Sequence, residues 1–125
     1  MTFAKVVFAL AGVWGIVVLT PLFFLVDITG TPYAPPSSYP HFFYGFFAVA
    51  MAWQLAFLII ASNPARYRLL MLPAVVEKLG FVATVAVLRG QGLVTMEEAS
   101  VAVPDLVLAV LFLAAFVRTP ADPAA

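Results

Sequence analysis

Four long apolar runs dominate this chain of 125 residues. Each run holds 17 to 21 residues with few polar side chains. At about 1.5 Å per residue, an α-helix of that length is about 25 to 32 Å long, which matches the hydrocarbon core of a bilayer. The sequence therefore predicts an all-α integral membrane protein, a single four-helix bundle with transmembrane helices over about residues 5–26, 42–61, 69–88 and 102–117.

The composition supports lipid as the solvent of this chain. Hydrophobic residues make up 65% of it, charged residues only 10%, and the mean hydropathy is +1.11. A soluble domain of this size leaves too much of its chain at the surface to hide so much apolar area. The six basic and six acidic residues balance, so we expect no nucleic-acid partner. With no cysteine and one histidine, we expect no metal site and no cofactor.

The basic residues predict how the helices are oriented. Lys5 precedes the first run, Arg66 and Arg68 lie between the second and third, and Arg118 follows the fourth. Because basic residues collect on the cytoplasmic side, both termini and the second loop are expected in the cytoplasm. Only Arg89 disagrees with this orientation. The first run is too long for a signal peptide and lacks a cleavage pattern, so we expect it to remain as a span.

Glu77 and Lys78 interrupt the middle of the third run. A charged side chain that faces lipid at this depth costs about 2.5 to 3.5 kcal/mol on insertion scales, so a functional or partner-binding role is expected for Glu77. Neighbours in a helix point about 100° apart, so Lys78 is not expected to neutralise Glu77. Helical spacing places Glu77, Gly80 and Thr84 on one small and polar face, which we expect inside the bundle. Lys78 lies on another face, which is expected to point outward, although its long stem could carry the ammonium group toward water or toward a partner helix.

Other side chains could share a cavity with Glu77, and each also has a structural interpretation. Gln54 is able to hydrogen-bond between helices, and the two tryptophans are able to act as packing residues. Asp27, His41 and Tyr44 lie near the outer ends of their spans, and such residues are typical of the membrane interface. Asp105 is expected to stabilise a helix start and to lie too far from Glu77 for direct pairing. The candidate ligand-binding residues are Glu77, Thr84, Gln54, Asp27, Trp14, Trp53, His41 and Tyr44.

Two loops carry patterns of their own. The stretch from residue 27 to 41 contains four prolines and predicts a stiff connector, with a lid over a cavity as the alternative. The stretch "TMEE" in the third loop predicts a capping box at Thr95 and a short interfacial helix.

Three segments, "PLFFLVD", "WQLAF" and "RYRLLMLPAVV", together resemble the EXPERA group, which contains the emopamil-binding sterol isomerase and its four-span relatives. The resemblance implies a sterol-like ligand, with Asp27 in the place of the acid that ends the group's first span. The group's second-span acid falls on Ala50 here, so Glu77 would have to take its role. The layout is also similar to that of small bacterial DoxX-type proteins, and we expect a bacterial inner membrane.

The leading hypothesis is a protein that binds a sterol-like or lipid-like molecule in an outward-opening cavity within the bundle, with Glu77 as its polar anchor. The alternative is an accessory subunit of a membrane complex, or a homo-oligomer, that pairs through Glu77 or Lys78. An EXPERA-like isomerase and a proton-coupled transporter rank below these, so an enzyme is not the first expectation.

Overall fold

The computed structural model describes residues 2–29 and 40–121, apart from the side chains of residues 22–29, Pro40 and Phe43. The proline-rich connector therefore lies outside the described residues, except at its ends. Within the described ranges the secondary structure is entirely helical, as the sequence predicts. The elements are α1 (Thr2–Thr29), α2 (Pro40–Ser62), η1 (Arg68–Leu70), α3 (Met71–Gly90), α4 (Met96–Ala99), η2 (Ser100–Ala102) and α5 (Val103–Arg118).

Four helical segments in the described part of the chain are long and apolar enough to cross a membrane, which confirms the expected number of spans. The fourth segment is longer than expected because α4 and η2 run directly into α5, so that it covers Met96–Arg118. Large apolar side chains such as Leu10, Val76 and Val117 are exposed on these helices. Acyl chains would cover such side chains in a bilayer.

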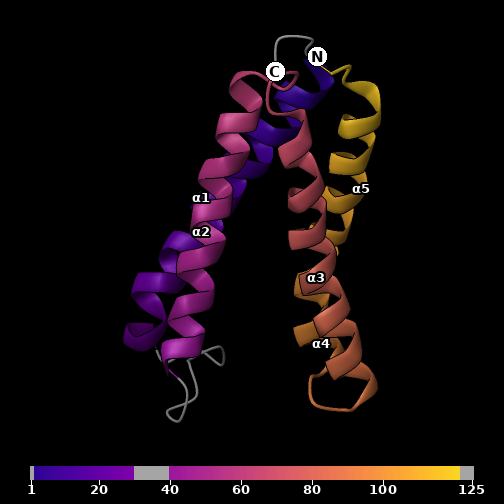
Figure 1. The fold of residues 1–125 in the computed structure, drawn as a ribbon. Coiled ribbons are helices and arrows are strands. Elements are labelled where there is room, and N and C mark those ends of the chain that lie inside the picture. The colour runs from indigo at the N-terminus through magenta and orange to yellow at the C-terminus, as the bar shows by residue number, and fades with distance from the viewer. Residues whose placement is uncertain (1, 30–39, 122–125) are drawn as a thin grey trace.

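The helices form two antiparallel hairpins that are joined at one end and separate toward the other (Figure 1). The first hairpin consists of α1 and α2, and the second of α3 and α5. The start of α1, the end of α5 and the link between α2 and α3 lie where the hairpins meet, which we call the closed end. The turn between α3 and α4 lies at the opposite end, which we call the open end.

A buried aromatic cluster joins the hairpins toward the closed end. The rings of Phe8 on α1 and Phe112 on α5 stack with their centroids 4.3 Å apart. Phe57 on α2 packs edge-on against Phe112 at 4.9 Å. All three side chains are fully buried, and alanines such as Ala4 and Ala115 allow the helices to approach around them. This cluster is the hydrophobic core of the molecule, and aromatic packing of this kind adds to the burial energy.

Arg68 fastens the link between the hairpins to the end of α5. Its Nε donates hydrogen bonds to the carbonyl oxygens of Phe116 at 3.2 Å and Thr119 at 2.5 Å. Its guanidinium group also lies over the Phe116 ring, 3.8 Å from the centroid. The last carbonyls of a helix have no partner within the helix, so this arginine satisfies groups that would otherwise be left unpaired.

The turn that leads into α4 contains the predicted capping box. The backbone N–H of Glu98 donates to the Thr95 hydroxyl at 3.1 Å, and the backbone N–H of Thr95 donates to the Glu98 carboxylate at 3.1 Å. The predicted capping box is therefore confirmed. The helix that it begins is not a separate short helix, because α4 runs through η2 into α5.

Candidate functional site

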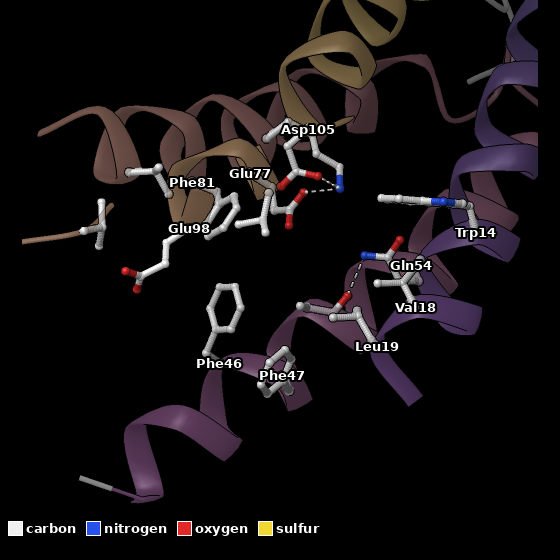
Figure 2. Close-up of a pocket in the computed structure, with 16 residues that line it drawn as sticks. Trp14, Val18, Leu19, Phe46, Phe47, Gln54, Glu77, Phe81, Glu98 and Asp105 are labelled. Carbon is white, nitrogen blue, oxygen red and sulfur yellow. Dashed lines mark hydrogen bonds and ion pairs between the residues drawn. The ribbon is translucent and has the colours of Figure 1, made fainter. Parts of the chain in front are cut away.

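A cavity of about 590 Å³ lies between the two hairpins on the open side of the aromatic cluster (Figure 2). Both hairpins contribute to its wall. Most of the wall is apolar, and its larger side chains are Trp14, Val18, Leu19, Phe46, Phe47 and Phe81. A few polar or charged side chains interrupt this lining, namely Gln54, Glu77, Lys78, Glu98 and Asp105.

Lys78 connects two carboxylates at the wall formed by the second hairpin. Its Nζ lies 3.1 Å from Asp105 Oδ1 on α5 and 3.7 Å from Glu77 Oε2 on its own helix. Figure 2 shows both carboxylates turned toward the ammonium group. Lys78 is only 4% exposed, and its Nζ lies 5.3 Å from the centre of the Phe57 ring. A cation removed from water needs such partners, so these contacts compensate for its burial.

The expected direction of Lys78 is therefore wrong. The 100° step between neighbours fixes where the Cβ atoms point, but a four-carbon stem lets the ammonium group reach a partner away from that direction. In the structure the stem crosses to Asp105 on the neighbouring helix, and Glu77 comes within 3.7 Å of the same ammonium group. Asp105 does lie in the first turn of α5, as expected of a helix-start acid, but it also pairs with Lys78.

The face of α3 expected inside the bundle is also corrected by the structure. Lys78, Phe81 and Val85 line the cavity together with Glu77. Gly80 and Thr84 are exposed instead, and the Thr84 hydroxyl donates a hydrogen bond to the Gly80 carbonyl at 2.8 Å. A threonine that satisfies its hydroxyl within its own helix does not need a polar environment. The stripe of Glu77, Gly80 and Thr84 therefore did not identify which face of α3 lies inside the bundle.

Gln54 is held tightly where the first hairpin meets the cavity. It is 2% exposed, and its Nε2 donates to the carbonyl of Ala50 at 2.9 Å. Its Oε1 is buried and has no hydrogen-bond partner. This oxygen lies against Gly15 of α1, where a Cβ atom would come within 1.9 Å of it. The amide is therefore locked between α1 and α2 beside the cavity.

The structure brings some of the predicted site residues to the cavity and leaves others elsewhere. Glu77, Gln54 and Trp14 line it. Trp53 packs against Phe57 in the core, His41 is exposed beside the Phe42 ring, and Thr84 and Tyr44 are not in the lining. The side chain of Asp27 lies outside the described residues.

Several lining residues were not among the sequence candidates, chiefly Lys78, Asp105, Glu98, Phe46 and Phe81. The signal for the Lys78–Asp105 pair was available. A buried cation on the third span requires a carboxylate from another helix, and Asp105 is the acid within the fourth apolar run, residues 101–117. For Phe46 and Phe81 the sequence holds no such signal, because apolar side chains lie on most faces of α2 and α3.

The arrangement is suited to holding an amphipathic molecule. Within residues 2–29 and 40–121 no group of three or more His, Cys, Asp or Glu side chains is placed to hold a metal ion. The Lys78 ammonium group lies between the carboxylates of Asp105 and Glu77. An apolar wall with such a polar cluster can bury a hydrophobic body and fix one polar end of it.

No protein-family model matches the chain, and no curated protein or solved structure shows significant similarity to it. The function is therefore inferred from the site.

Proposed function

We propose that the protein binds a small hydrophobic molecule, sterol-like or lipid-like, in the cavity between its hairpins. The observation that carries this proposal is a cavity of about 590 Å³ whose apolar wall is interrupted by a compact polar cluster. Binding sites for small molecules typically have volumes of about 300–1,000 Å³ and combine an apolar lining with a few convergent polar groups.

Glu77 is the side chain best suited to anchor the polar end of the ligand. Asp105 already accepts a hydrogen bond from Lys78 at 3.1 Å, whereas Glu77 Oε2 lies 3.7 Å from the ammonium group. The Glu77 side chain is still 20% exposed and lines the cavity, so its carboxylate keeps acceptor capacity on the cavity side. A ligand hydroxyl group would donate a hydrogen bond to this carboxylate.

The test compares the Glu77→Gln variant with the unaltered protein. Purified protein in detergent would be titrated with 12-bromododecanol, a long-chain alcohol whose bromine isotope doublet identifies the complex by native mass spectrometry. Because a hydrogen bond to a charged group contributes about 1.5–3 kcal/mol, we expect E77Q to fold normally and to bind the alcohol about 10-fold or more weakly. Thr84→Val, which changes an exposed side chain of the same helix outside the lining, is the control and should bind normally. Equal affinities for E77Q and T84V would refute the anchoring role.

The alternative, an accessory subunit that pairs through Glu77 or Lys78, has less support. Lys78 is buried and engaged within the chain, so a partner helix would have to break an existing ion pair to reach it. The same mass spectra separate the two functions. A protein that carries the alcohol or a co-purified lipid agrees with ligand binding, and a second polypeptide in fixed proportion agrees with the accessory role.

A further inference from the structure

Two phenylalanines, one from each hairpin, meet across the gap between α2 and α3. The ring centroids of Phe46 and Phe81 are 5.8 Å apart, and the ring planes are inclined by 29°. Both side chains line the cavity, and Figure 2 shows them on opposite sides of its space. Phe46 is also 49% exposed, so other side chains leave about half of this residue uncovered.

The outer side of this wall faces lipid. Phe81 lies four residues from Glu77, which is about 6 Å along α3 toward the open end and still within the hydrocarbon depth of the third span. On α2 the exposed side chains next to Phe46 are also apolar, and Val49, one turn away, is 61% exposed. An apolar molecule dissolved in the bilayer would thus meet Phe46 before any polar group.

We propose that the ligand reaches the cavity sideways from the bilayer, through a portal between α2 and α3 that Phe46 and Phe81 close. This inference rests on the proposed function, since it supplies the route to the same cavity. The two rings are the gate: while they stack, they narrow the gap between α2 and α3, and rotation of either ring widens it. A lateral route keeps a hydrophobic ligand in an apolar medium, whereas a route through water would require its transfer out of lipid.

The gap between α2 and α3 is easier to widen than the closed end. At the closed end the hairpins are held by the buried Phe8–Phe57–Phe112 cluster and by the hydrogen bonds of Arg68. The contact between Phe46 and Phe81 involves one pair of rings, and one of them is half exposed. Exposed side chains change rotamer within picoseconds to nanoseconds, so the gate can open without disturbing the core.

The absence of cysteine from the chain allows a clean cross-linking test. The double variant F46C/F81C would be loaded with 12-bromododecanol and then joined by a short, reducible bis-thiosulfonate reagent. The loaded protein would be moved into lipid nanodiscs that lack the alcohol, and native mass spectra taken over time would give the rate of its loss. We expect the cross-linked protein to lose the alcohol at least 10-fold more slowly than the same protein after reduction.

The matched control is F3C/R118C, which joins the hairpins at the closed end. There the Arg118 guanidinium lies 4.4 Å from the centre of the Phe3 ring, far from the gate. This control should lose the alcohol at the same rate whether it is cross-linked or reduced.

A second measurement avoids cross-linking altogether. The F81A variant removes one ring of the gate and should release the alcohol faster than the unaltered protein.

Three results would overturn the proposal, and they differ from one another. If F46C/F81C loses the alcohol at one rate in both states while still binding it, the portal is refuted and the proposed function survives. If cross-linked F3C/R118C also loses the alcohol more slowly, the slower loss comes from restraining the hairpins, and the gate is refuted. If no variant, and not the unaltered protein either, ever carries the alcohol, the proposed function fails and the portal fails with it.

Discussion

At the scale of single residues, the ion pairs of Lys78 have the largest effect on what this molecule can do. A lysine that is 4% exposed in the middle of a membrane span is stable only with a carboxylate beside it, and Asp105 supplies one at 3.1 Å. Because Asp105 comes from α5, the pair also joins two helices. Glu77 lies farther from the ammonium group than Asp105 does, at 3.7 Å.

Asp105→Asn should therefore destabilise the protein strongly. Removing one partner of a buried ion pair typically costs about 3–5 kcal/mol, and we expect a value at or below the lower end because Glu77 remains 3.7 Å from the ammonium group. Thermal unfolding in detergent, followed by circular dichroism, would measure the loss. Glu97→Gln, which changes an exposed acid of α4, is the control and should unfold with the unaltered protein. Coincident transitions for D105N and E97Q would show that the pair contributes nothing.

The position of Glu77 near the middle of the third apolar run could be read from the sequence, and its depth in a bilayer stays a prediction. The direction of Lys78 could not be read in this way, and the difference has a physical cause. Depth follows from counting residues along a helix that must cross the bilayer. Direction depends on where a long and flexible side chain finds a partner, and the partner here lies 27 positions away on another helix. The role of Glu77 as an anchor stays a prediction.

At the scale of the helices, the first hairpin depends on two glycines of α1. A Cβ atom at Gly12 would lie 2.7 Å from Leu58 Cδ2, and one at Gly15 would lie 1.9 Å from Gln54 Oε1. Close approach of this kind is how helices associate in membranes, where no hydrophobic force draws them together. The position of Gln54 beside the cavity is thus a result of how tightly α1 and α2 pack.

Gly15→Ala should separate α1 from α2 or push the Gln54 side chain out of its place. Overpacking of a tight contact costs about 1–3 kcal/mol, which thermal unfolding in detergent would detect. The control is Gly45→Ala on α2, where a Cβ atom would meet nothing within 4 Å and where alanine should be neutral or slightly stabilising. Adding Gln54→Ala to G15A should restore most of the lost stability. If the double variant is as unstable as the two single changes added together, the clash with Gln54 is not the cause.

Local patterns predicted the helices better than they predicted their faces. The capping box at Thr95 was found from four consecutive letters because both of its hydrogen bonds are local. The interior face of α3 was assigned to the Gly80 and Thr84 stripe, yet Thr84 satisfies its hydroxyl within α3 and faces outward. In a chain where most faces are apolar, neither hydrophobic contrast nor an isolated hydroxyl identifies the buried side.

At the scale of the whole molecule, the separation of the two hairpins creates the cavity. The sequence analysis expected a cavity within the bundle, but no sequence pattern predicted that the hairpins separate. The number of spans and the all-helical class followed from the apolar runs and are confirmed. Packing between hairpins depends on contacts between residues far apart in the chain, such as Phe8 with Phe112. A sequence with apolar residues on nearly every helix face does not reveal which of them meet.

The distribution of charge predicts how the molecule lies in its membrane. Lys5, Arg66, Arg68 and Arg118 gather at the closed end, where the described residues include no acidic side chain, so this end is expected in the cytoplasm. Cysteines introduced at Ser62, near the closed end, and at Ser100, near the open end, would test this with a membrane-impermeant maleimide on bacterial spheroplasts. S100C should react in intact spheroplasts and S62C only after permeabilisation. The reverse pattern would contradict the orientation.

The bridge between Lys78 and Asp105 also limits how the protein can change shape. Turning α3 about its axis by one residue would separate the ammonium group from Asp105, and sliding α3 along α5 would do the same. We therefore expect the second hairpin to move as one lever. If the cavity takes up a ligand as proposed, the accompanying motion reduces to a swing of that lever about its fastened end, together with the flipping of rings at its edge.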